Sequence, residues 1–232
     1  AAGEWDRTVE WELTKSVDID SHTGVAGDLF DSIWEVVATK IDSGPMNFAV
    51  AGTISIYNPA AIAQSFIVSD VLDDSTAATV DCPSLTVASL DTVVCTYTAA
   101  PLDDSATLNT ATVTAAGNPA QTATAAVGWT ENLTGYDEGE LSDPRFAYSS
   151  MISGSTTENF PEQFECSTDP ADYTNGSYSE TFTNWAYLDG NIDLSASEDV
   201  TINCSLPPLE VTKTAAGEWD RTVEWELTKS VD

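Results

Sequence analysis

The chain ends as it begins. The eighteen residues AAGEWDRTVEWELTKSVD occupy positions 1–18 and again positions 215–232. Self-similarity at a fixed period is typical of repeat architectures. Two arrangements account for it: the chain spans slightly more than one period of a covalent tandem array, or its terminal strand leaves the chain and completes a neighbour by donor-strand addition. Both arrangements predict a polymer whose partners are copies of the chain itself.

Short segments with alternating apolar and polar residues recur along the chain, and no window shows a helical period. In TVEWELTKSV, the side chains of Val9, Trp11, Leu13 and Val17 share one face. Similar runs follow at short spacing, with turn signals between them, which is typical of β-sandwiches. We therefore predict an all-β protein with a β-sandwich over 1–128, a second and smaller sandwich over 129–210, and a segment 211–232 that holds a linker and the first strand of the next repeat.

Several of these runs resemble one family. The stretches VEWELTKSVD, GTISIYNPA, FIVSDVL, CTYT and LNTATVT occur in the order found in Ig-like repeats of unknown function from very large bacterial and archaeal surface proteins. The resemblance covers most of 1–128, and it extends more weakly into the second half through CSTD, FTNWAYL and VTINCSL. It implies two Ig-like sandwiches arranged end to end, in a secreted structural protein without enzymatic chemistry.

The charge balance excludes two classes of partner. Thirty-eight acidic residues stand against seven basic ones, for a formal net charge of −31. Nucleic acids and anionic membrane surfaces both require a basic footprint, which this chain lacks. No apolar run is long enough to cross a bilayer, so we expect no membrane insertion within this segment.

The cysteine spacing predicts disulfides rather than a metal knuckle, because no CxxC pair is present. The cysteines are Cys82, Cys95, Cys166 and Cys204. Pairing the first two and the last two gives one crosslink per sandwich, each worth roughly 3 kcal/mol; four buried free thiols are the alternative. Disulfides imply an oxidising compartment, so we expect an extracellular or cell-surface location. Three sequons, at Asn132, Asn175 and Asn203, are candidate glycosylation sites.

Three polar residues fall on faces that alternation assigns to the core: Lys15, Asp70 and Asn109. Burying any of them alone would cost several kcal/mol, of the order of 2–7 for a neutral polar group, so we expect them to meet. A lysine, an acid and an asparagine can form an intramolecular isopeptide bond, in a layout that resembles pilin and adhesin Ig-like domains. The alternatives are a buried Lys15–Asp70 ion pair beside Asn109, or an edge at which all three reach water.

The repeated copy of this lysine, Lys229, would act in the same way in the next unit. The second half of the chain offers Asp143 and Asn184, but no lysine lies between Lys40 and Lys213. We therefore expect no crosslink within the second sandwich.

No cofactor is required by any motif, and calcium is the one candidate ligand. The DGNID stretch places oxygen ligands at Asp189, Asn191 and Asp193, with the alternating spacing of calcium loops. The bidentate glutamate of such loops is absent, since its position holds Val200. The only histidine, His22, lies in a Ser/Asp/Gly-rich stretch and is expected to be a solvated loop residue.

These observations favour a structural subunit of an extracellular filament or cell-surface stalk over an enzyme. A surface adhesin that binds glycans or a partner protein is the alternative. It would use exposed side chains of the second half, with Tyr173, Tyr178 and Trp185 as candidates.

Overall fold

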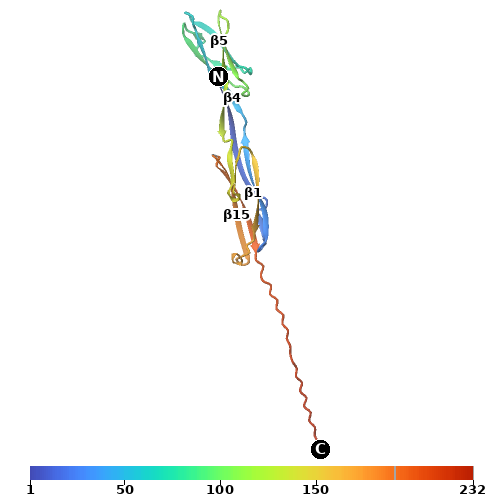
Figure 1. The fold of residues 1–232 in the computed structure, drawn as a ribbon. Coiled ribbons are helices and arrows are strands. Elements are labelled where there is room, and N and C mark those ends of the chain that lie inside the picture. Colours follow the sequence, from blue (N-terminus) through green and yellow to red (C-terminus); the bar gives the residue numbers. More distant parts are fainter. Residues whose placement is uncertain (191, 232) are drawn as a thin grey trace.

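The computed structural model describes residues 1–190 and 192–231 and shows an elongated all-β protein (Figure 1). The expected fold class is confirmed. In the described residues the regular structure consists of strands and two single-turn 3-10 helices. These elements are β1 (Ala2–Val17), β2 (Ser21–Val25), β3 (Leu29–Asp42), β4 (Met46–Tyr57), β5 (Gln64–Leu72), β6 (Thr79–Asp81), β7 (Thr86–Val87), β8 (Thr92–Ala99), β9 (Leu108–Ala115), β10 (Gln121–Ala126), β11 (Gly128–Gly135), β12 (Gly139–Asp143), η1 (Pro144–Phe146), β13 (Tyr148–Ile152), β14 (Thr156–Glu165), η2 (Pro170–Asp172), β15 (Ser177–Asp189) and β16 (Leu194–Ser205).

The long strand β1 is the spine of the molecule. It lies inside a sheet of order β14-β3-β1-β4-β8-β6, and β11 also pairs with it. Its first half pairs in parallel with β11 and antiparallel with β4, beginning at Ala2 opposite Ala51. Its second half pairs antiparallel with β3, ending at Val17 opposite Trp34. One strand thus runs from one part of the molecule into the other.

Two parts of the molecule hold separate cores. The first core region lies between β4, β8 and β6 on one side and the sheet β10-β9-β5-β7 on the other. Its core residues are Val50, Ile54, Phe66, Leu72, Val87, Cys95, Tyr97, Ala99, Ala106 and Ala111. The second core region lies between β14, β3 and the second half of β1 on one side and the sheet β13-β12-β15-β16-β2 on the other. Its largest buried side chains include Trp34, Leu141, Leu188 and Ile202.

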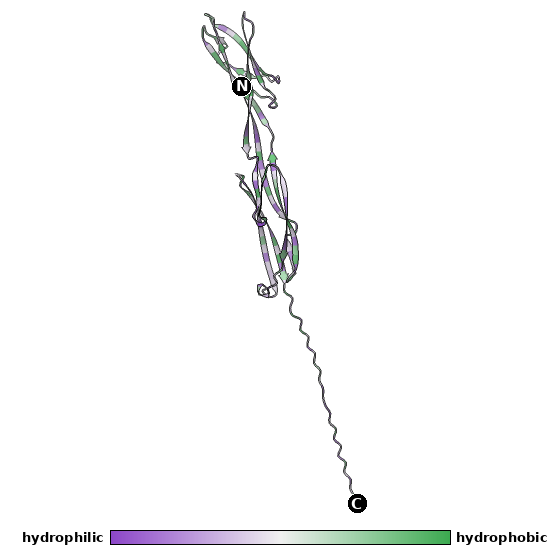
Figure 2. Cartoon of the chain, in the orientation of Figure 1, coloured by the Kyte–Doolittle hydropathy of each residue, from purple (hydrophilic) through white to green (hydrophobic). Residues whose placement is uncertain are grey.

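Alternation along the strands builds these cores. In β8 the burial alternates residue by residue, with Cys95, Tyr97 and Ala99 buried and the residues between them exposed. Such alternation places every second side chain of a strand on one face. Figure 2 shows the same mixture of hydrophilic and hydrophobic residues along the other strands.

The division of the chain differs from the expected boundary at residue 128. β2 pairs with β16, and β14 pairs along its whole length with β3, from Leu29 opposite Glu165 to Ala38 opposite Thr156. Residues of the first strands therefore belong to the second core region. Alternation indicates which face of a strand is buried, but it carries no information on which distant strand pairs with it.

Both expected disulfides are present and confirm the predicted pairing. Cys82 is bonded to Cys95 in the first core region, and Cys166 is bonded to Cys204 in the second. Each region therefore carries one covalent crosslink of its own.

The second copy of the β1 sequence lies outside the fold. Residues 206–231 form no strand and extend from the end of the molecule opposite the first core region (Figure 1). Trp11 in β1 is 8% exposed, whereas its counterpart Trp225 is 91% exposed. Within the described residues, no helix is long and apolar enough to cross a membrane.

Candidate functional site

Ion pairs connect the β1 residue Arg7 to the strands and loops around it. Arg7 donates to Asp42 at 2.6 Å and to Asp137 at 2.7 Å, and its other terminal nitrogen reaches Glu131 at 3.3 Å. Lys40 also contacts Asp137, at 2.9 Å. The guanidinium of Arg7 holds the pKa of Asp42 well below its ordinary value, and Lys40 followed by Arg7 lowers the pKa of Asp137. Three acidic side chains thus surround the guanidinium of Arg7 at this point of the strand.

Further along the same strand, apolar side chains anchor it. Val9 and Trp11 are buried, and the indole N–H of Trp11 donates to the carbonyl oxygen of Tyr136 at 2.8 Å. Burying a tryptophan and satisfying its one polar atom stabilises the strand and fixes its register. The same residue types recur in the second copy as Arg221 and Trp225.

Lys15, near the end of β1, lies in a fully buried polar cluster. Its ammonium nitrogen is 2.6 Å from Oδ2 of Asp143 and 5.5 Å from the centroid of the Trp34 ring. The Lys15 side chain is 0% exposed and that of Asp143 is 1% exposed. The amide of Asn184 donates to the same Oδ2 at 3.2 Å, while Oδ1 of Asn184 has no hydrogen-bond partner. Asp143 therefore holds the lysine and the asparagine amide together on one oxygen atom.

The trio expected from the sequence is not assembled in this form. Lys15 does point inward, but it contacts Asp143 and Asn184 rather than Asp70 and Asn109. The reason is the length of β1, which leaves the first core region before it reaches Lys15. The expectation of no crosslink within the second sandwich rested on the absence of a lysine between Lys40 and Lys213, but β1 brings Lys15 into that region.

Asp70 and Asn109 form an incomplete counterpart in the first core region. Both are 3% exposed, and they lie on neighbouring strands, since Asn109 pairs with Leu72 two residues beyond Asp70. Neither carboxylate oxygen of Asp70 has a hydrogen-bond partner, nor has the amide nitrogen of Asn109. Burial raises the pKa of Asp70, and the adjacent Asn109 amide opposes part of that rise. Buried polar groups are rarely left unsatisfied in this way, so the pair requires an explanation.

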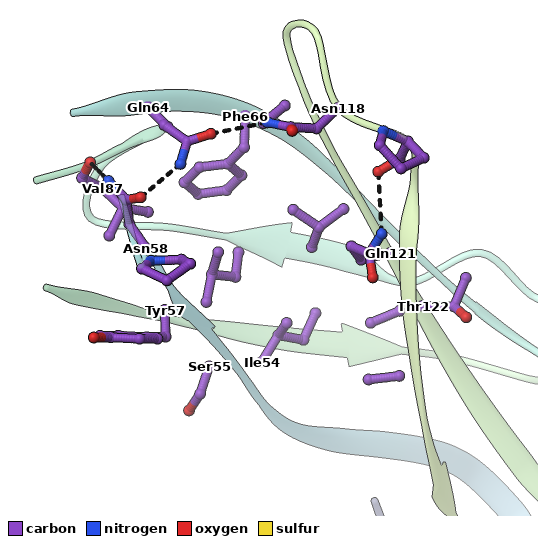
Figure 3. A pocket seen from close by; sticks show the side chains of 17 residues that line it. Ile54, Ser55, Tyr57, Asn58, Gln64, Phe66, Val87, Asn118, Gln121 and Thr122 are labelled. Carbon is purple, nitrogen blue, oxygen red and sulfur yellow. Dashed lines mark hydrogen bonds between the residues drawn. The ribbon is translucent and has the colours of Figure 1, made fainter. Parts of the chain in front are cut away.

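An open groove lies in the same region (Figure 3). Its volume is about 560 Å³, and it is lined by apolar residues of β4, β5 and β9, among them Ile54, Ile56, Phe66 and Ala111. Asn58, Gln64 and Asn118 close one end through a chain of hydrogen bonds, with Gln64 donating to Asn58 at 2.6 Å and accepting from Asn118 at 3.0 Å. The groove thus has apolar walls and one polar end.

The calcium hypothesis receives no support from side-chain placement. Asn191 lies outside the described residues, and Asp189 stands at the end of β15. In residues 1–190 and 192–231, no group of three or more His, Cys, Asp or Glu side chains could hold a metal ion. The three sequon asparagines, Asn132, Asn175 and Asn203, are all exposed.

Two further expectations concern the second core region. His22 is not a solvated loop residue: it is buried in β2, stacks on Phe30 with ring centroids 4.8 Å apart and contacts Ser32 at 2.7 Å. Of the aromatic residues considered for adhesion, Tyr173 packs on Tyr178, whereas Trp185 stacks on Tyr187. The three candidate aromatics are therefore split between two separate stacks.

Sequence comparison does not assign a function to this geometry. The chain matches no family model and no curated protein. What the arrangement can do follows from its residues alone: an exposed second copy of a central strand, a buried Lys–Asp–Asn cluster, and a second Asp–Asn pair beside an open groove.

Proposed function

We propose that the protein is a structural unit of an extracellular filament or cell-surface stalk, joined head to tail through the repeated terminal strand. The observation that carries the proposal is the contrast between the two copies. Residues 2–17 are the central strand of the fold, while the identical residues 216–231 extend into solvent. The exposed copy therefore fits the β1 position of another unit, in place of that unit's own residues 2–17.

The direction of the exposed segment supports a linear assembly. It leaves the end of the molecule opposite the first core region (Figure 1). A second unit that received this segment as its own β1 would therefore extend the first along its long axis. Such a heterologous contact does not close on itself and generates open fibres. The strong acidity and the two disulfides suit an extracellular setting.

Light scattering and electron microscopy test the proposal. Unfolding and refolding the full chain at rising concentration lets residues 215–232 of one chain take the β1 position of another, so chains of units are expected to lengthen with concentration. A Trp225→Asp variant should remain monomeric, because a charge cannot occupy the buried position of Trp11. Single globules at every concentration, with residues 215–232 unprotected in hydrogen exchange, would contradict the proposal.

The covalent and the non-covalent forms of the polymer are separable on material from its native source. A covalent tandem array gives a mass on a denaturing gel far above one repeat. Donor-strand assembly gives a band of one unit, unless crosslinks join the units.

Within each unit, we propose that Lys15 and Asn184 form an isopeptide bond. A proton passes from the Lys15 ammonium to Asp143, which leaves a neutral amine and a carboxylic acid in a site closed to water. The amine attacks the side-chain carbonyl carbon of Asn184, the acid protonates the departing nitrogen, and one ammonia leaves as the new C–N bond replaces the old one. The shared contact on Asp143 supports this assignment.

Intact mass of the reduced full chain tests the crosslink. We expect a mass lower than that of the sequence by one ammonia molecule. Lys15→Met and Asn184→Ala should each restore the full mass, whereas Lys229→Met, the same change in the exposed copy, should leave the deficit in place. An unmodified chain at full mass contradicts the crosslink and leaves the head-to-tail proposal untouched.

A further inference from the structure

The pairing of β1 stops at the edge of the open groove. The N-terminal nitrogen of Ala1 donates to the carbonyl oxygen of Ala126 at 3.2 Å, and the N–H of Gly128 donates to the carbonyl of Ala1 at 3.3 Å. This is the pattern of a parallel ladder that continues to the first residue. Beyond it, among the described residues, β4 after Ala51 pairs only with β8, and β10 pairs only with β9.

The groove therefore has the form of a strand position between two free edges. Residues 52–57 of β4 form one edge, and residues 121–126 of β10 form the other. Both segments also contribute to the groove lining in Figure 3. A single strand laid in line with β1, running toward Ala1, would pair with both edges and cover the apolar walls.

The sequence before the second copy supplies such a strand. Ala215 is the counterpart of Ala1, so Thr214 and Lys213 are the counterparts of the two residues that would precede Ala1. Because Ala2 pairs with Ala51 and the ladder is antiparallel, the same register places Thr214 opposite Thr53. Leu209, the first residue of the segment Leu209–Thr214, then falls opposite Asn58. Pro207 and Pro208 precede it and end the pairing, since proline cannot donate to a ladder.

The alternation of this segment matches the groove. In β1 the odd-numbered positions Gly3, Val9 and Trp11 are buried. Continuing that period turns Leu209, Val211 and Lys213 inward and turns the residues between them to solvent. Val211 falls opposite Ile56, a residue of the apolar wall. Val211 thus meets the apolar wall of the groove, and Leu209 lies at the end that holds Asn58.

The inward-facing side chain of Lys213 would lie near the buried pair Asp70 and Asn109. In the parallel ladder Ala2 lies opposite Gly128, so Lys213 falls opposite Ala125. Ala125 pairs with Asn109 on the next strand, and Asn109 is the neighbour of the buried Asp70. The segment Val211–Thr214 reads VTKT and Leu13–Ser16 reads LTKS, so both share the order apolar, threonine, lysine, hydroxyl. The arrangement repeats the Lys15 cluster in the other core region.

We propose that the open groove receives Leu209–Thr214 of a second copy of this chain, and that Lys213 of that copy forms an isopeptide bond with Asn109. This inference rests on the head-to-tail polymer proposed above and names the joint between its units. The Lys213 amine attacks the side-chain carbonyl carbon of Asn109, Asp70 carries the proton from the amine to the leaving nitrogen, and one ammonia departs. The product is an amide that links one unit covalently to the next.

The chain length between the units agrees with this joint. β16 ends at Ser205, and only Leu206, Pro207 and Pro208 separate it from the segment that enters the groove. Three residues span at most about 10 Å. The end of one unit would then abut the first core region of the next, and the two prolines would restrict the angle between them.

The full chain with nine residues added before Ala1 tests the joint. The addition repeats Leu206–Thr214, LPPLEVTKT, and so presents the groove with its occupant at high effective concentration. We expect the reduced protein to lack one more ammonia than the unextended chain does. A peptide map should join the added copy of Lys213 to Asn109. Hydrogen exchange should slow at the Thr53, Ser55 and Tyr57 amides, which face the open edge of β4, and in β10.

Three variants sharpen the result. Asn109→Ala, or methionine in the added copy of Lys213, should remove the extra ammonia loss while exchange protection persists. One residue inserted between the added Thr214 and Ala1 reverses the faces of the strand and should abolish both signals.

An added segment that stays exposed, with unchanged exchange in β4 and β10, overturns the inference. Protection without the ammonia loss overturns the crosslink and retains the strand position. Either failure is distinct from failure of the polymer itself, because refolded full chains would still associate through residues 215–232.

Discussion

Each core region contains a buried aspartate and a buried asparagine, but the groups that surround the two pairs differ. In the second region, Asp143 and Asn184 share a buried lysine. In the first region, Asp70 and Asn109 are also buried, but neither carboxylate oxygen of Asp70 has a hydrogen-bond partner, next to a groove flanked by free strand edges. The second region holds a lysine beside its pair, whereas the first has an open groove beside its pair. The difference teaches that an unsatisfied polar pair can mark where another molecule is expected to bind.

The largest difference between the regions should appear when the two aspartates are removed. Asp143→Ala leaves the Lys15 charge buried without a partner, which is expected to lower the free energy of unfolding by roughly 3–5 kcal/mol. Asp70→Ala removes a group that has no partner to lose, so we expect a change of no more than about 1 kcal/mol. Urea denaturation of the two variants measures both effects. Equal losses would show that Asp70 is paired in the isolated chain.

The disulfides provide a second comparison with a smaller contrast. The loop closed by Cys166–Cys204 has a sequence separation of 38 and that closed by Cys82–Cys95 has one of 13. The loop-entropy relation then gives stabilisations of roughly 4 and 3 kcal/mol. Paired Cys→Ala variants, unfolded in urea, test this order. A larger loss from the shorter loop would mean that the first core region, with its open groove, depends more strongly on its disulfide.

The smallest expected effect is a difference in pH dependence. The folded-state pKa of Asp70 is raised by burial, so the native state holds that proton more tightly than the unfolded state does. Its contribution to stability is therefore full below the ordinary value of 3.8 and falls as the pH rises through the raised pKa. Asp42 and Asp137 have lowered pKa values, so their contribution is lost as the pH falls below their ordinary values.

Urea unfolding at a series of pH values measures this contrast. Asp70→Asn should remove the fall in the free energy of unfolding that occurs as the pH rises above 3.8. It should leave the decline toward low pH, which arises from the Arg7 ion pairs. If the free energy of unfolding of Asp70→Asn still falls as the pH rises above 3.8, a group other than Asp70 causes that fall.

Much of the fold follows from the sequence because its signals are local. Alternation identified the strands, and it also placed Lys15, Asp70 and Asn109 correctly on inward faces. The cysteine spacing predicted both disulfides.

The partners of Lys15 could not be predicted in the same way, because strand pairing depends on residues more than a hundred positions apart. The sequence offers Asp143 and Asn184 in the second half, but position in the chain assigns Lys15 to the first half, because the path of a long strand is not visible in its sequence. One overlooked signal could have indicated the groove: the VTKT stretch before the second copy repeats the pattern around Lys15.

The path of β1 determines how the molecule responds to mechanical load. A force applied to the two ends of this strand acts along its axis, whereas its hydrogen bonds to β3, β4 and β11 lie across that axis. All of these bonds are then strained together and must fail together, instead of opening one after another from an edge. Under such a force the two core regions would be strained together, and resistance to extension would be set by the ladder of one strand.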